Sequence, residues 1–286
     1  MKRLVILMVV VFLCSPLMAQ IWVEHDPGHC TVGPPPICVS GHWYYVELPK
    51  LQTSTFRPQG EESRERQLIK PAELSTDLEY ESFSYDGDFY DVNGSSIGLK
   101  AAYERMTSST FSYGARLLYE KGNIKDSDYS PYFFAGHVFA KKWLGELIFV
   151  SGGFSYSSYK GGDDIDPLSS LGPVVSVGLE YYVGSVLIGG GVSYQYSKIS
   201  FEEAKGYDFF EDGRSNLSFG LNGGYELGES MFIAAEFYKL TGLSVIGTTL
   251  SYFVSETFAL TLGYKTILGL EQFTNHKITL GSSVRF

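Results

Sequence analysis

Residues 174–199 read VVSVGLEYYVGSVLIGGGVSYQYSKI, and this stretch decides the fold class. Every second position from Val175 to Tyr181 is apolar, and the same holds from Ile188 to Tyr196 apart from one glycine. The positions between them carry serine, glycine, glutamate or glutamine. A period of two is typical of a strand with one apolar face and one small or polar face, and residues 183–185 form a tight turn between two such strands.

The same alternation recurs from residue 77 to the end of the chain. The expected strands are residues 77–86, 96–106, 110–120, 132–142, 144–159, 174–183, 186–199, 216–227, 231–240, 243–254, 257–268 and 277–286. Single-chain bacterial barrels have an even number of strands. We therefore expect about twelve, with ten or fourteen as the alternatives.

The connections between these strands alternate in length. Those near residues 106–109, 183–185, 228–230 and 255–256 are tight, whereas residues 87–95, 121–131, 160–173 and 200–215 form long connections. Short periplasmic turns and long external loops are typical of outer-membrane barrels. The long connections are rich in aspartate and glutamate, so an acidic outer face is expected.

Composition supports the same class. The chain has 21 Tyr, 20 Phe and 32 Gly. Beyond the N-terminal residues, no uncharged apolar run approaches the roughly 18 residues that a transmembrane helix needs. The prediction is an all-β fold, a transmembrane antiparallel up-and-down β-barrel preceded by a short irregular segment. A soluble β-sandwich explains neither the alternating connections nor the glycine and serine that fill one face.

The first 75 residues differ from the rest. Lys2 and Arg3 precede an apolar stretch over residues 4–13, and Ala19 comes just before polarity returns. This pattern predicts a secretory signal peptide over residues 1–19. Residues 20–75 form a module rich in Pro, Cys and His followed by a polar linker, and residues 76–286 form the barrel.

Cys30 and Cys38 lie in that module. Two cysteines in an exported chain predict a disulfide, because the periplasm is oxidising. The alternative is a zinc or copper site completed by His25, His29 and His42, since thiolate and imidazole bind both metals. The spacing matches no standard zinc finger, so the disulfide is preferred and no metal site is predicted.

The last nine residues, ITLGSSVRF, alternate apolar side chains and close on an aromatic residue. This ending resembles the C-terminal assembly signal of Gram-negative outer-membrane β-barrel proteins, with Leu280, Val284 and Phe286 at the matching positions. The resemblance implies insertion by the barrel-assembly machinery and location in the outer membrane. The strand number is similar to that of autotransporter translocator barrels, but no long passenger precedes the barrel.

The alternation also assigns charged side chains to the lumen. These are Lys100, Glu104, Arg116, Glu120, Glu180, Glu226, Glu236, Lys265 and Arg285. They could filter ions by charge, or they could pair in a lattice that closes the lumen. A barrel of eight strands is filled by its own side chains and one of sixteen leaves a channel, so twelve lies between these limits.

The predicted function is a passive channel for small solutes. The first alternative is a closed structural or surface-binding barrel whose acidic loops contact partners or lipopolysaccharide, and the second is an outer-membrane enzyme. Catalysis is not expected, because His137 has no nucleophile and orienting partner in the sequence pattern. No cofactor is predicted. The expected partners are outer-membrane lipid, lipopolysaccharide and the assembly machinery, and the formal charge of -10 without basic clusters argues against nucleic acid.

Overall fold

The computed structural model describes residues 72–86, 91–125, 130–145, 147–160, 168–201, 211–228, 230–240, 243–268 and 273–286. The predicted signal peptide, residues 20–71 of the predicted N-terminal segment and the Cys30 and Cys38 pair lie outside these residues. Residues 72–75, expected in the linker, belong to the first strand. Within the described part of the chain, no helix has the length and apolar character required to cross a membrane.

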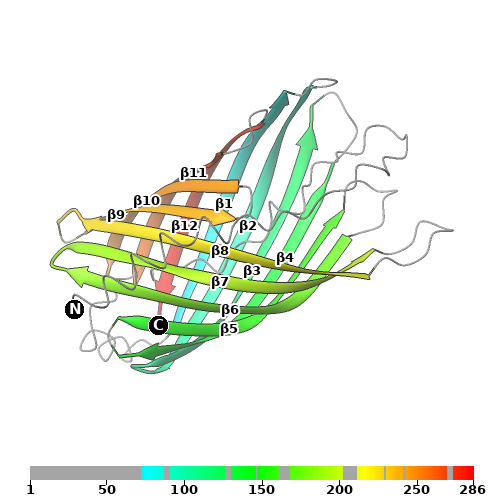
Figure 1. Cartoon of the computed structure of the whole chain (residues 1–286). Coiled ribbons are helices and arrows are strands. Elements are labelled where there is room, and N and C mark those ends of the chain that lie inside the picture. The colour runs from blue at the N-terminus through cyan, green and yellow to red at the C-terminus, as the bar shows by residue number, and fades with distance from the viewer. Residues whose placement is uncertain are drawn as a thin grey trace. The chain divides into compact units, whose positions relative to one another are not determined.

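Twelve antiparallel strands form one closed barrel (Figure 1). They are β1 (Ala72–Asp86), β2 (Asp91–Ser108), β3 (Phe111–Ile124), β4 (Tyr132–Leu144), β5 (Ile148–Lys160), β6 (Leu168–Val183), β7 (Val186–Phe201), β8 (Glu211–Glu226), β9 (Met231–Leu240), β10 (Leu243–Ser255), β11 (Phe258–Leu268) and β12 (Phe273–Arg285). Each strand pairs with its neighbours in sequence, and β12 pairs with β1. The predicted all-β barrel and its twelve strands are confirmed.

The first and last strands close the barrel. Their register runs from Glu73 opposite Arg285 to Tyr85 opposite Phe273. At one end of this ladder, the Ala72 amide donates to the Phe286 carbonyl at 3.0 Å, and the Phe286 amide donates to the Ala72 carbonyl at 2.9 Å. Closure matters because an unpaired backbone edge in hydrocarbon would cost several kcal/mol for each polar group.

The register also sets the width of the barrel. A path that moves from each residue to its paired residue on the next strand does not return to its starting point after one circuit of the barrel. It reaches β1 about fourteen residues further along, and this offset is the shear of the barrel. With strands about 4.8 Å apart and a rise of about 3.3 Å per residue, this shear gives a tilt of about 40° and a backbone radius of about 12 Å.

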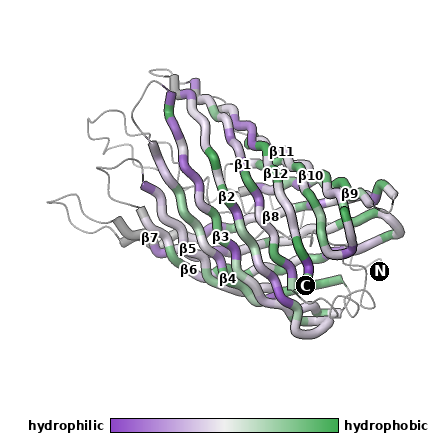
Figure 2. Tube along the Cα trace, turned by 180° about the vertical axis from the view of Figure 1, so that it is seen from behind, coloured by the Kyte–Doolittle hydropathy of each residue, from purple (hydrophilic) through white to green (hydrophobic). Residues whose placement is uncertain are grey.

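The two faces of the strands differ sharply in exposure. Leu117 is 53% exposed while its neighbour Leu118 is 3% exposed, and Leu78 is 53% exposed while Glu79 is 1% exposed. Figure 2 shows hydrophobic and hydrophilic residues alternating along the strands. Every strand carries large apolar side chains on its outward face. So continuous an exposed apolar surface requires a lipid environment.

Tight turns gather at the end of the barrel that holds Ala72 and Phe286. The β6–β7 turn consists of Gly184 and Ser185, and Gly184 has a positive φ of 59°, which glycine adopts without steric cost. The longer connections lie at the opposite end. We call these the turn end and the loop end.

Several strands, among them β2, β6, β8 and β12, extend further toward the loop end than the sequence predicts. β6 begins at Leu168 although Gly172 and Pro173 were expected to lie in a loop. Pro173 fits because the β6–β7 pairing is interrupted between Leu171 and Val174, so the missing N–H leaves no ladder bond unmade there.

Candidate lumenal site

Five charged side chains gather on the inner wall formed by β12, β1, β2 and β3. They are Glu79, Glu81, Lys100, Glu120 and Lys277, and we call them the lumenal ion cluster. Their exposed side-chain fractions are 15% or less. Three carboxylates face two ammonium groups, so the formal charge of the cluster is negative.

Lys277 lies at the centre of the lumenal ion cluster. Its Nζ is 2.7 Å from Glu81 Oε2, 3.3 Å from Glu120 Oε2 and 3.5 Å from Glu79 Oε2. The second ammonium group, Lys100 Nζ, is 2.8 Å from Glu79 Oε1. One cation thus holds three carboxylates that would otherwise repel one another in a poorly hydrated place.

Neutral donors complete the carboxylate environment. The Ser96 hydroxyl donates to Glu120 Oε1, and the Asn275 amide donates to Glu81 Oε1. The Thr279 hydroxyl donates to Glu79 Oε1 at 3.3 Å. Buried charges persist in proteins when they are paired and hydrogen-bonded in this way.

A second ion pair lies on the inner faces of β9 and β11. Lys265 Nζ is 2.5 Å from Glu236 Oε1, and the Tyr238 hydroxyl donates to Glu236 Oε2 at 2.7 Å. The intervening position on β10 is Gly247, whose missing side chain leaves room for both partners. This pair is slightly more exposed than the lumenal ion cluster.

Further polar contacts line the lumen near the turn end. Arg285 Nη2 is 3.3 Å from Glu73 Oε2. The Ser112 hydroxyl donates to Glu104 Oε1 at 2.6 Å. These contacts connect strands that are adjacent in the barrel.

The inner wall of β3, β4 and β5 carries cations packed on aromatic rings. The Arg116 guanidinium lies 4.8 Å from the centre of the Phe139 ring, and His137 stacks on the same ring at 5.6 Å. Lys141 Nζ lies 4.4 Å from the Trp143 ring and 4.2 Å from the Phe149 ring. Such contacts stabilise a cation by about 0.5–2 kcal/mol.

The inner wall of β5 to β8 is lined by small residues. They include Gly153, Ser155, Ser176, Gly178, Gly189, Gly191, Ser193, Ser218 and Gly220. The Ser176 and Ser193 hydroxyls form a hydrogen bond with each other, and Gln195 Nε2 donates to Ser155 Oγ at 2.8 Å. The lumen therefore has a charged wall and a wall of small residues.

The structure places the nine charged residues predicted to line the lumen on the inner faces of their strands, and it brings only some of them together. Lys100 and Glu120 join the lumenal ion cluster, and Glu236 pairs with Lys265. Arg116, Glu104 and Arg285 have the separate contacts described above, whereas Glu180 and Glu226 lie on β6 and β8, away from the cluster.

Three members of the cluster are absent from the sequence prediction. They are Glu79, Glu81 and Lys277, on β1 and β12. The sequence does carry the period-two signal for β1, because Leu78 and Tyr80 alternate with Glu79 and Glu81 in the way that apolar and polar residues alternate on the other strands.

The residues of the proposed assembly signal face outward. Leu280, Val284 and Phe286 are 57%, 41% and 59% exposed. They form part of the apolar outer surface on β12 and beside it.

A closed barrel of twelve antiparallel strands with an apolar outer surface and a polar lumen is the fold of outer-membrane β-barrel proteins. No protein-family model matches the chain, and no curated protein matches it. Solved structures do match, and autotransporter barrels are among them.

The translocator domain of the autotransporter NalP from Neisseria meningitidis is similar with a TM-score of 0.52 and 16% identity, over 76% of this chain and 88% of that one. The β domain of the Bordetella autotransporter BrkA matches with a TM-score of 0.54 and 10% identity, over 76% of this chain and 100% of that one. The KdgM porin has a TM-score of 0.42 and 12% identity, over 73% and 99% of the two chains. At these identities the likeness shows the fold alone.

Proposed function

We propose that the chain resides in a bacterial outer membrane and acts as a passive channel for small solutes. The apolar outer surface supports the location, because it suits lipid on all sides of the barrel. The lumen is the route for solutes.

The wall of small residues on β5 to β8 carries this proposal. A barrel that closes by packing must fill its interior with side chains from all sides, as eight-stranded barrels do. Here a backbone radius of about 12 Å is combined with glycine and serine along one wall. Glycine and serine take up less of the interior than large side chains would, and Ser176, Ser193 and Ser218 are themselves 4–8% exposed.

The charged wall gives the channel a preference for cations over anions. Three carboxylates outnumber two ammonium groups in the lumenal ion cluster, and low-dielectric walls strengthen the field of a charged lining. The channel should conduct small cations more readily than anions.

Conductance in planar bilayers tests the proposal. The purified full chain should give discrete conductance steps. Ser193→Trp places an indole on the inner wall and should lower the step size, whereas Val192→Trp places it on the outer face and should not. Each variant is first checked for heat-modifiable migration, which reports folding. Absence of steps from the folded parent, or equal steps from both variants, would contradict the proposal.

A closed structural barrel is the second candidate, and the burial of several inward side chains favours it. Leu187 and Ala259 are 0% exposed, and Phe149 is 3% exposed. The same recording separates the two candidates, since a closed barrel gives no steps in either variant or in the parent.

A further inference from the structure

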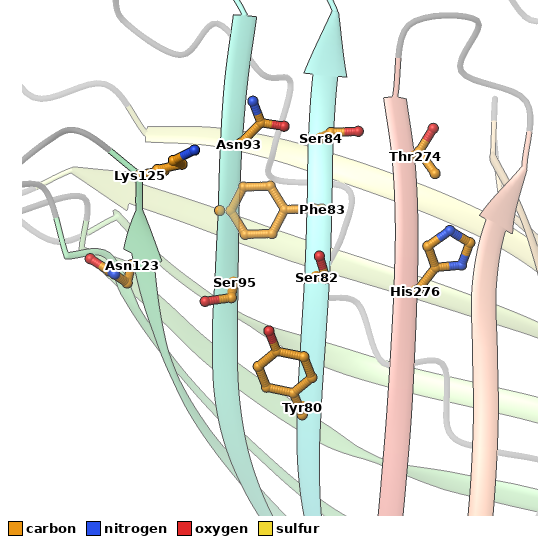
Figure 3. Close-up of a pocket in the computed structure, with 11 residues that line it drawn as sticks. Tyr80, Ser82, Phe83, Ser84, Asn93, Ser95, Asn123, Lys125, Thr274 and His276 are labelled. Carbon is orange, nitrogen blue, oxygen red and sulfur yellow. The ribbon is translucent and has the colours of Figure 1, made fainter.

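A cavity of about 340 Å³ opens on the outer side of β12, β1, β2 and β3, near the loop end. Figure 3 shows Tyr80, Ser82 and Ser84 of β1 at its centre, with side chains of β2 and β12 on either side. The described lining residues are mostly polar. The large aliphatic side chains that cover the outer rows nearer the middle of these strands are absent here.

Register across the strands shows how abruptly the outer surface changes. Tyr80 lies opposite Ile97 on β2 and Ile278 on β12, and both isoleucines are about half exposed. The next two outward rows toward the loop end are His276, Ser82 and Ser95, and then Thr274, Ser84 and Asn93. Toward the loop end, the outer surface thus changes from aliphatic groups to hydroxyl, amide and imidazole groups between one outward row and the next, a distance of two residues along each strand.

Tyrosines mark the boundary between the two zones. Tyr80, Tyr119 and Tyr264 are 50%, 48% and 42% exposed on β1, β3 and β11, and β3 and β11 each lie two strands from β1. The Tyr264 hydroxyl is 2.6 Å from His276 Nδ1, which ties the boundary to the polar rows. Tyrosine gathers where hydrocarbon meets headgroups, so the cavity lies at headgroup depth.

The charge at the cavity is positive. Lys125 is the only lining residue with a full charge among those described, and its amide donates to the Asn93 carbonyl at 2.8 Å, which fixes it beside the outermost row. Lys121 lies two rows below on β3, opposite Ile97 and outside the lining residues. Neither lysine forms an ion pair within the described part of the chain. Asp86, the next outward carboxylate on β1, does not line the cavity.

We propose that this cavity binds the phosphorylated sugar headgroup of an outer-leaflet glycolipid of the lipopolysaccharide class. The loop end faces the outer leaflet, because tight turns and strand termini gather at the periplasmic end of such barrels. Lys125 and Lys121 pair with phosphate, the serine, asparagine and histidine side chains hydrogen-bond the sugar, and Tyr80 packs at the root of the acyl chains. An acyl chain then follows the aliphatic rows below.

Native mass spectrometry of the full chain in detergent tests this site with diphosphorylated lipid A as the probe. Lys125→Gln should weaken binding about tenfold, as expected for the loss of one charge-assisted hydrogen bond. The matched control is Lys142→Gln, an exposed outward lysine of β4 near the turn end, which should bind like the parent. Ser82→Phe fills the cavity without a change of charge and should also weaken binding.

The comparison lipids are dephosphorylated lipid A and phosphatidylglycerol, and both should bind more weakly than the probe. Equal binding by the parent and Lys125→Gln would overturn the proposal, as would equal binding of lipid A and phosphatidylglycerol. The variants lie on the outer face, so their conductance should stay at the parent level. A failure here is therefore distinguishable from a failure of the channel proposal.

Discussion

Replacing Lys277 by methionine removes the central cation of the lumenal ion cluster while keeping the length of the side chain. Three carboxylates then lose a partner that lies 2.7, 3.3 and 3.5 Å away. Lys100 remains, with its Nζ 2.8 Å from Glu79 Oε1. Removing one partner of a buried ion pair destabilises a protein by about 3–5 kcal/mol, because an uncompensated charge is left behind. We expect a loss of this size in the free energy of unfolding.

The measurement is urea-induced unfolding of the barrel in lipid vesicles, followed by the loss of heat-modifiable migration. The comparison variant is Lys265→Met, in which a single carboxylate loses its partner, and a smaller loss of about 1.5–3 kcal/mol is expected. Adding Glu120→Gln to Lys277→Met should recover part of the stability, since it removes one of the uncompensated charges. The coupling should amount to about 0.5–3 kcal/mol.

Two results would contradict this expected loss of stability. One is a Lys277→Met barrel within about 0.5 kcal/mol of the parent, which is the usual range for surface substitutions. The other is strict additivity of the Lys277 and Glu120 substitutions. Either would mean that the lumen hydrates these charges as bulk water does.

Three further predictions concern assembly, the lipid face and strand packing. Phe286→Ala should reduce the amount of folded, heat-modifiable protein in the outer membrane and leave chain in the periplasm; normal outer-membrane levels would count against the assembly role. Leu99→Arg, at an outward position that is 57% exposed, should destabilise the barrel in vesicles by about 2–4 kcal/mol, and an unchanged unfolding midpoint would argue against lipid contact there. Gly172→Ala should cost about 1–3 kcal/mol because the new Cβ would overlap the Tyr196 carbonyl oxygen, whereas Gly152→Ala, with its nearest contact at 4.0 Å, should be nearly neutral; equal effects would contradict the close packing of β6 on β7.

Most of the fold could be predicted because it depends on a local signal. Alternation along a single strand decides which side chains face lipid, and each strand carries that information by itself. The ends of strands at the loop end were harder to predict. Gly172 and Pro173 are typical loop residues, and only the gap in the β6–β7 ladder shows that β6 accommodates both.

The lumenal ion cluster could be predicted only in part, because it depends on distance across the barrel. Alternation assigns Lys100 and Glu120 to the inner face, but the partners they meet depend on register and closure. Lys277 reaches Glu79 and Glu81 only because β12 pairs with β1, which are about 200 residues apart in sequence. No local pattern specifies which charges meet in this way.

Alternate residues of each strand face lipid and lumen, and Leu117 and Leu118 of β3 offer the sharpest check of this arrangement. They are neighbours of the same type, 53% and 3% exposed. With the three native tryptophans replaced by phenylalanine, Leu117→Trp or Leu118→Trp is introduced and the chain is folded into vesicles of lipids with brominated acyl chains. Strong fluorescence quenching is expected at position 117 and little at position 118. Equal quenching at the two positions, or none at either, would contradict it.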